Sequence, residues 1–263
     1  MVMHVSGHLN PGGQQFRGDH GAADPQVTAA LAAYQAGQGS EQAALHALAA
    51  ARLLVPVIAV LTDGAAPGAA HPAAPGAADP AAPRAAHPAG PRATTSPEGD
   101  KDSEMMLPTL IGRDGRPAVL AFTCLDALAR WRQDARPVPA GADRVWRAAV
   151  ADGCAVVIDV AGPVPLAVEG ARLAALAAGQ PVPPPHQDPD VHAAVEAAIA
   201  GESAIAGFSL AVGRADGTDL AVMLRLTAPR TDGWAPAVNR AAASIAARLA
   251  ARLRRGIEVS IAR

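Results

Sequence analysis

Cys124 is the side chain with the clearest potential for chemistry in this sequence. It follows Thr123, a residue that can cap a helix, and so falls at the predicted N-terminus of a short helix. The helix dipole and the free N–H groups there favour a thiolate, the nucleophilic form of cysteine. No histidine base is near in the sequence, and the nearest acid, Asp126, opposes ionisation. Cys124 is therefore the single candidate for a catalytic residue, and the alternative is a small residue in a helix's first turn.

Histidines could bind a metal ion if the fold held several of them on one surface. His4 and His8 form an HxxxH pair and His20 follows, but the glycines and the proline among them argue against the single helix face that such a pair needs. His46 lies beside the apolar stripe of a predicted helix, with no second ligand or carboxylate in view, which is typical of a histidine at the boundary of a core. We expect neither a metal ion nor a cofactor.

Asp159 is the acid on the strongest predicted strand, Cys154 to Val160. It has no evident carboxylate partner, so the sequence does not support general acid–base chemistry, and we interpret Asp159 as a polar residue at a strand end. Cys154 opens the same strand and is interpreted as a small hydrophobic residue. The sequence contains no GxGxxG, P-loop, HExxH or GxSxG motif.

Arginines gather near the C-terminus of a long predicted helix. Arg248, Arg252 and Arg255 share one face of that helix, with Arg254 beside it. Positive charge is favoured at a helix C-terminus, so this pattern predicts a solvated face. Nucleic-acid binding would need a broader basic patch with aromatic residues, and the net charge of −2 gives no general attraction to nucleic acid or to an anionic membrane. We expect no nucleic-acid binding.

The composition points to the cytoplasm. The two cysteines form no CxxC pattern, for which a reducing compartment is the simplest interpretation. No apolar run approaches the roughly 18 residues that a membrane helix needs. The first residues are polar and rich in glycine, unlike a signal peptide. We expect a cytoplasmic protein that does not bind a membrane.

The elements that must position these residues are clearest between Leu107 and Trp131. Two short apolar runs, Leu107 to Ile111 and Pro117 to Phe122, flank Gly112-Arg113-Asp114-Gly115, and Asp-Gly between apolar runs predicts a β-hairpin. A short helix capped by Thr123 is predicted to follow the hairpin.

This stretch resembles the SseB (enhanced serine sensitivity protein B) N-terminal domain family, of the actinobacterial type. The resemblance rests on Leu107-Pro108-Thr109-Leu110, the turn from Gly112 to Gly115, Ala121-Phe122-Thr123 and Trp131, and it covers roughly residues 25–190. It carries over no catalytic residue, cofactor or reaction, because the family name records a serine-sensitivity phenotype and not a mechanism.

The chain is expected to divide into a disordered tail (1–23), an SseB-like domain (24–186) and a C-terminal domain (187–263). The first domain contains an Ala/Pro insertion at 63–103 that lacks large apolar residues and repeats an octapeptide three times. Such a segment cannot bury enough apolar surface to order itself, so we predict a disordered, partly extended loop. Its PxxP repeats leave open a ligand for a partner's groove, and the alternative is a solvated spacer.

The predicted fold class is mixed α/β (α+β). We expect an N-terminal lobe with a mixed sheet and flanking helices, and a smaller C-terminal α-β-β-α-β lobe. The C-terminal lobe is predicted from an apolar helix stripe, two strands at 204–212 and 220–226, a long helix at 236–255 and a last strand at 257–261. Ile245, Leu249 and Leu253 should dock the long helix on the sheet.

No activity follows from these residues. The absence of a catalytic constellation favours a non-enzymatic interaction or regulatory protein with a protein partner. A thiol-dependent enzyme acting through Cys124 and a small-ligand-binding module are the alternatives.

Overall fold

A computed structural model describes residues 16–61, 103–106, 108–112, 115–213, 217–227 and 234–262. The chain divides into two compact units, Met1–Ile58 with Met106–Arg263, and Ala59–Met105. The predicted insertion lies outside the described residues except for Ser103, and so do His4 and His8.

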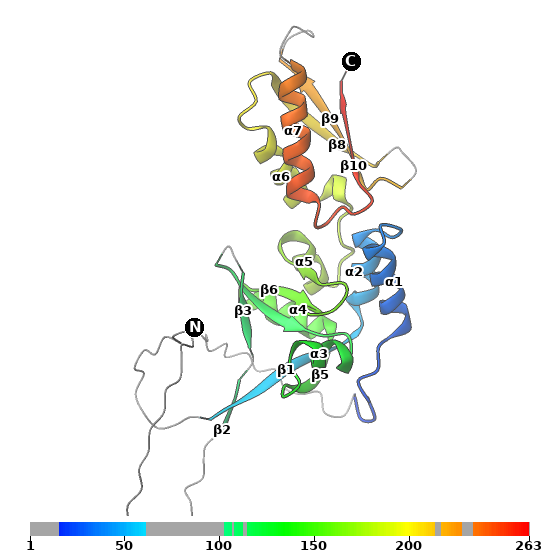
Figure 1. The fold of residues 1–263 in the computed structure, drawn as a ribbon, viewed down its shortest axis with the longest axis vertical. Helices are drawn as coiled ribbons and strands as arrows, with labels where there is room; N and C mark the ends of the chain where they lie inside the picture. Colours follow the sequence, from blue (N-terminus) through cyan, green and yellow to red (C-terminus); the bar gives the residue numbers. More distant parts are fainter. Residues whose placement is uncertain are drawn as a thin grey trace, which may run out of the picture. The chain divides into compact units, whose positions relative to one another are not determined.

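The described elements are helices and strands interspersed along the chain (Figure 1). In chain order they are α1 (Pro25–Gln35), α2 (Glu41–Ala49), β1 (Arg52–Leu61), β2 (Ser103–Met106), β3 (Thr109–Ile111), β4 (Pro117–Ala121), α3 (Leu125–Trp131), β5 (Arg136–Gly141), α4 (Ala142–Ala151), β6 (Ala155–Ile158), β7 (Leu166–Val168), α5 (Gly170–Ala177), the 3-10 helix η1 (Pro185–Gln187), α6 (Pro189–Ile199), β8 (Ile205–Ala211), β9 (Leu220–Leu226), α7 (Trp234–Leu249) and β10 (Ile257–Ile261).

A mixed four-stranded sheet lies at the centre of the N-terminal part, in the order β3-β4-β6-β7. Strands β4 and β6 are parallel, with Val119 opposite Val156, and β3 and β7 flank them in antiparallel orientation. The predicted hairpin is confirmed as β3–β4, where the Gly112 N–H donates to the Arg116 carbonyl at 2.8 Å. Gly115 has a φ of +79°, a value that a residue with a side chain rarely adopts.

Helices α1, α2, α4 and α5 share an apolar core with this sheet. Side-chain caps start the first two helices: Asp24 accepts from the Gln26 N–H at 2.8 Å, and Ser40 from the Ala43 N–H at 3.1 Å. Trp146 of α4 is fully buried. An aromatic ring of that size fills space that the many alanines of this core leave open.

The C-terminal part has its own core around a three-stranded sheet in the order β10-β9-β8. Strand β10 runs parallel to β9, and β8 runs antiparallel to it. Helices α6 and α7 pack on this sheet (Figure 1), and the predicted contacts of Ile245 and Leu249 are confirmed by their burial among the β9 side chains. The mixed α/β fold class is therefore correct.

The end of the last helix differs from the prediction. The sequence predicted a helix to Arg255, but α7 ends at Leu249, and turns lead to Gly256. The Leu253 N–H donates to the Leu249 carbonyl at 2.9 Å, so Leu253 still reaches the core, where it is buried. Beyond this end, the Tyr34 hydroxyl donates to the Ala251 carbonyl at 2.7 Å.

Candidate functional site: a groove along α2, α4 and α5

Helix α2 buries one face and presents the other to a groove. Ala44, Leu45 and Leu48 are fully buried on the inner face. The outer face carries Gln42, Ala43, His46 and Ala50, all of which are exposed. The helical period of 3.6 residues separates the two sets, so the outer face is available to form a surface.

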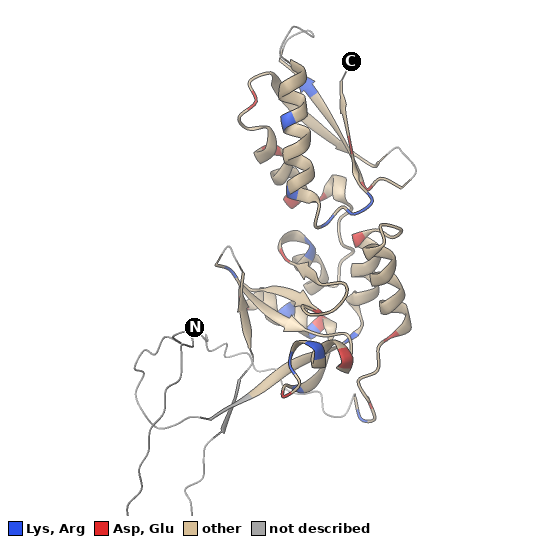
Figure 2. Cartoon of the chain, viewed as in Figure 1, with Lys and Arg blue, Asp and Glu red and all other residues tan. Residues whose placement is uncertain are grey.

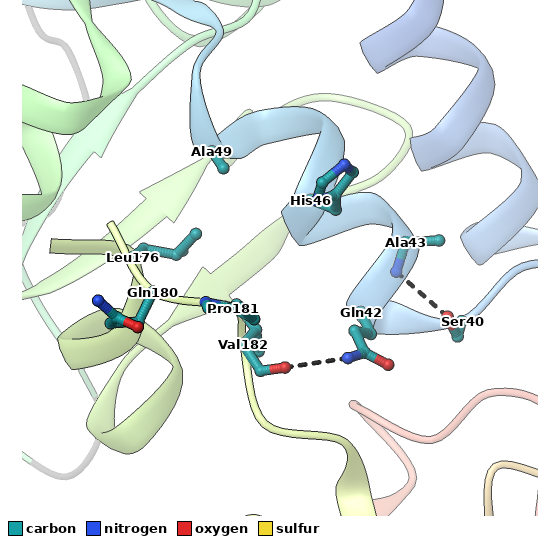
Figure 3. Close-up of a pocket in the computed structure, with 9 residues that line it drawn as sticks. All are labelled: Ser40, Gln42, Ala43, His46, Ala49, Leu176, Gln180, Pro181 and Val182. Carbon is teal, nitrogen blue, oxygen red and sulfur yellow. Dashed lines mark hydrogen bonds between the residues drawn. The ribbon is translucent and has the colours of Figure 1, made fainter. Parts of the chain in front are cut away.

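Two adjoining hollows, of about 320 Å³ and 620 Å³, form this groove. His46, Ala49, Leu176, Gln180 and Pro181 line both hollows, so we treat the two as one feature and call it the α2–α5 groove. Figure 3 shows the smaller hollow, with Leu176 pointing toward α2. The remaining lining residues are Ser40, Gln42, Ala43 and Val182 in the smaller hollow, and Ala50, Asp143, Arg147, Ala177, Ala178 and Gly179 in the larger.

The groove combines small apolar side chains with neutral hydrogen-bonding groups. Buried Leu176 and Val182 contribute apolar surface. At one end the Gln42 side-chain amide donates to the Val182 carbonyl at 3.0 Å (Figure 3). At the other end Arg147 and Asp143 form an exposed i,i+4 ion pair, so their charges balance.

Thr123 and Asp159 lie beyond the carboxyl ends of the parallel strands β4 and β6. The sequence predicted that Thr123 caps α3, and this is wrong: the cap is Cys124, whose sulfur accepts from the Ala127 N–H at 3.4 Å. Thr123 instead bonds to Asp159, with its N–H at 2.8 Å from one carboxylate oxygen and its hydroxyl at 2.7 Å from the other. The carboxylate therefore ties the end of β4 to the end of β6.

Asp159 holds this position in an unusual backbone conformation. Its φ is +47°, in the left-handed region, which Asp tolerates better than most residues with a side chain. Burial raises the pKa of its carboxyl, and the hydrogen bonds from Thr123 and the charge of Arg130 offset that rise in part. Because both oxygens accept bonds from Thr123, the prediction of a simple strand-end residue misses a buried link across the sheet.

Cys124, the single catalytic candidate from the sequence, lies at the start of α3. It is half-buried, and its sulfur accepts the hydrogen bond that begins α3. The first N–H of the helix, from Leu125, donates to the Gly21 carbonyl at 2.9 Å. The backbone N–H groups at the start of α3 thus bond to Cys124 itself and to the Gly21 carbonyl.

The predicted arginine face is wrong because Arg252 lies beyond the end of α7. Its guanidinium contacts Glu41 at 3.2 Å and Asp188 at 2.5 Å, and Glu41 also pairs with Arg172. Glu41, Asp188 and Arg172 are all buried, and we call these four residues the ion cluster. Burial raises the pKa of Glu41, although both arginines lower it in part.

The other three arginines also differ in their surroundings. Arg248 is on α7 and contacts Ser244 at 3.4 Å, whereas the Arg254 guanidinium lies 4.9 Å above the centre of the Tyr34 ring. The Arg255 N–H donates to Asp219 at 3.0 Å. The charged residues are spread over helices and turns, and most strand residues carry no charge (Figure 2).

His20, Cys154 and the possibility of a membrane helix were also considered from the sequence, and none of them involves the groove. His20 is exposed, and among the described residues no group of three or more His, Cys, Asp or Glu side chains could hold a metal ion. Cys154 is buried, which raises the pKa of its thiol. Within the described part of the chain, no helix is both long and apolar enough to cross a membrane.

Comparison with protein families places most of these elements in one domain. The model of the SseB protein N-terminal domain matches residues 27–175. The chain belongs to the SseB family. Comparison with curated proteins finds no match, and comparison with solved structures finds none.

The matched range contributes about half of the groove lining and part of the ion cluster. It includes the lining residues from α2 and α4, whereas those at 176–182 follow it. Glu41 and Arg172 lie within the match, and Asp188 and Arg252 lie beyond it. Sequence reasoning missed the groove because its residues come from three helices far apart in the chain, and the exposed face of α2 was the only local signal of it.

Proposed function

We propose that this SseB-family protein is an interaction or regulatory protein, and that it binds a segment of a partner protein in the α2–α5 groove. The observation that carries the proposal is the size of the α2–α5 groove together with the residues that line it. The two hollows are as large as ordinary ligand sites, and apolar surface with a few hydrogen-bonding groups is the usual composition of such sites. A protein segment with apolar side chains and an uncharged backbone fits that lining best.

The surroundings of the chemically capable side chains support binding over catalysis. Asp159 and Thr123 bond to each other, and Cys124 caps α3. A general base or a nucleophile must reach a substrate, whereas Thr123 and Asp159 are buried. The proposal therefore assigns these three residues to the architecture of the domain.

The proposal includes the wider expectations from the sequence. We place the protein in the cytoplasm, with a protein partner and without nucleic acid or membrane as ligands, in line with its net charge of −2 and its two free cysteines. The boundaries at 24–186 and 187–263, and the disordered tail over 1–23, stay predictions.

Affinity purification from the source cells tests the proposal when groove variants are included. Ala43→Arg places a long charged side chain in the groove, and Ala32→Arg places the same side chain on the exposed surface of α1, away from the groove. We expect Ala32→Arg to retain the partners of the wild-type protein, quantified by mass spectrometry, and Ala43→Arg to lose at least one of them. Equal retention by both variants would rule out the groove. Recovery of a tightly bound small molecule in place of a protein would favour the ligand-binding alternative.

A further inference from the structure

The SseB domain and the C-terminal part each have an apolar core of their own. The core of the SseB domain is built from side chains of α1, α2, α4 and α5 and of the mixed sheet. The second core contains side chains of α6, α7 and the β10-β9-β8 sheet, and it shares no residue with the first. Each core therefore has its own source of hydrophobic stability.

The contacts between these two cores pass through polar groups. Arg252 bonds to Glu41 of α2 and to Asp188, which caps α6 by accepting from the Asp190 N–H at 2.8 Å. The Asp190 carboxylate in turn accepts from the Ala171 N–H at the start of α5, at 2.8 Å. Charged and hydrogen-bonding groups make each of these contacts.

The turn after α7 adds further polar contacts with α1. The Tyr34 hydroxyl donates to the carbonyls of Ala251 at 2.7 Å and of Arg252 at 3.1 Å, and Arg254 stacks on the same ring. Gly37 is close enough that a Cβ there would lie 3.3 Å from the Arg254 carbonyl oxygen. Residues 251–254 thus fit closely against the SseB domain, and we call them the docking turn.

The geometry points to a conformational device: we propose that the docking turn is a polar latch that releases the C-terminal core from the SseB domain while both cores stay folded. Buried ion pairs add little net stability, because the loss of solvation offsets most of the attraction between the charges. The junction is therefore weak compared with the two apolar cores. The proline-rich segment from Pro181 to Pro185 connects the two parts and can serve as the hinge.

Release of the latch would also act on the edge of the α2–α5 groove. Glu41 lies between Ser40 and Gln42, which both line the groove. The Val182 carbonyl, which accepts from Gln42, is six residues before Asp188 in the same connecting segment. Rotation of the residues that follow Val182 would turn this carbonyl away from Gln42 and widen one end of the groove, while the Val182 side chain stays in the core of the SseB domain.

Hydrogen–deuterium exchange of the full-length Arg252→Met variant tests the latch. Without Arg252, Asp188 is a buried carboxylate without its cation, whereas Glu41 keeps Arg172 as its partner. We expect exchange at 186–192 and 249–256 to rise by about tenfold or more, because local opening limits exchange at protected amides. Exchange at 40–44 should rise as well. Peptides from α7 between 236 and 247, from β9 and from β6 should exchange as in the wild type.

Two further variants keep this test decisive. Arg240→Met removes an arginine from the exposed pair with Glu202 and should leave exchange at the junction unchanged. Tyr34→Phe removes only the hydroxyl and should raise exchange at 249–256 even if Arg252→Met does not fold. Wild-type exchange at the junction in both Arg252→Met and Tyr34→Phe would overturn the proposal. A rise that extends through α7 and β9 would also overturn it, because the C-terminal core would then not stay folded on release.

Discussion

Two regions of the SseB domain use polar side chains in opposite ways. Beyond the ends of β4 and β6, the polar atoms of Thr123 and Asp159 bond to each other, and Cys124 bonds to its own helix. Along the α2–α5 groove, His46 and Gln180 are exposed over a partly apolar lining. The region of Thr123, Cys124 and Asp159 resembles a catalytic site in its residue types but serves as a structural link. The groove has no such residue types, but its two hollows have room for another molecule.

The difference between these two regions shows that residue type is a poor guide to the location of a binding site in this chain. Cysteine, aspartate and threonine at the carboxyl ends of parallel strands occupy a place where ligands often bind in α/β sheets. Here Thr123 and Asp159 bond to each other, at distances of 2.7 and 2.8 Å, and both are buried. The groove is the region where an incoming molecule could make bonds that the chain does not already make.

The strongest test of the structural role is Asp159→Ala. This change leaves the buried N–H and hydroxyl of Thr123 without their acceptor, which should lower the free energy of unfolding by about 1–3 kcal/mol in urea denaturation. Asp143→Ala, at the exposed rim of the groove, is the control and should change stability by less than about 0.5 kcal/mol. Similar losses in both variants would remove the contrast between the two regions.

The pH dependence of stability in the wild type and in Asp159→Asn tests whether the Asp159 carboxyl is buried and desolvated. Burial raises the pKa of Asp159 above its value in the unfolded chain, so the folded protein binds this proton more tightly. The stabilisation linked to the raised pKa is complete below the unfolded value of about 3.9 and is lost as the pH rises through the folded value. The free energy of unfolding of the wild type minus that of Asp159→Asn should therefore fall between acidic and neutral pH in urea titrations. A difference that rises with pH would contradict a buried, desolvated carboxyl.

Cys124→Ser should have a smaller effect. Serine is a better helix cap than cysteine and has nearly the same shape, so the bond to the Ala127 N–H should be kept and stability should change by less than about 0.5 kcal/mol. Thermal or urea melts of the two proteins check this. A loss of more than about 1 kcal/mol would show that the sulfur does more than cap α3.

His46→Gln should have the least effect on folding. The side chain is exposed on the outer face of α2, so stability should stay within about 0.5 kcal/mol of the wild type. A circular dichroism melt is sufficient to measure it. A large loss would mean that His46 packs against the core, at whose boundary the sequence had placed it, and does not belong to the groove.

Local signals in the sequence predicted most of the elements. Asp-Gly predicted the β3–β4 hairpin, and Asp24 and Asp188, each followed by proline, are local signals of the same kind at the starts of α1 and α6. These signals succeed because caps and turns are satisfied by residues only a few positions away.

The features that the sequence did not predict depend on distant partners. The alanines and arginines after Leu249 favour continuation of the helix, but Glu41 and Asp188 take Arg252 out of it. Thr123 has the sequence of a cap, but Asp159, 36 positions away, takes its hydroxyl. The groove requires α2, α4 and α5 to meet, and no single stretch of sequence carries that information.

Site-specific photo-crosslinking in the source cells tests most directly whether partners bind at the groove. A benzophenone amino acid placed at Ala50 lies in the groove, and the same residue at Leu125 lies on the surface beside Cys124; both positions are exposed. We expect a discrete crosslinked protein from Ala50 that is absent from Leu125 and disappears when Ala43→Arg is added. A crosslink from Leu125 without one from Ala50 would contradict the account and would move the functional surface to the region of Cys124.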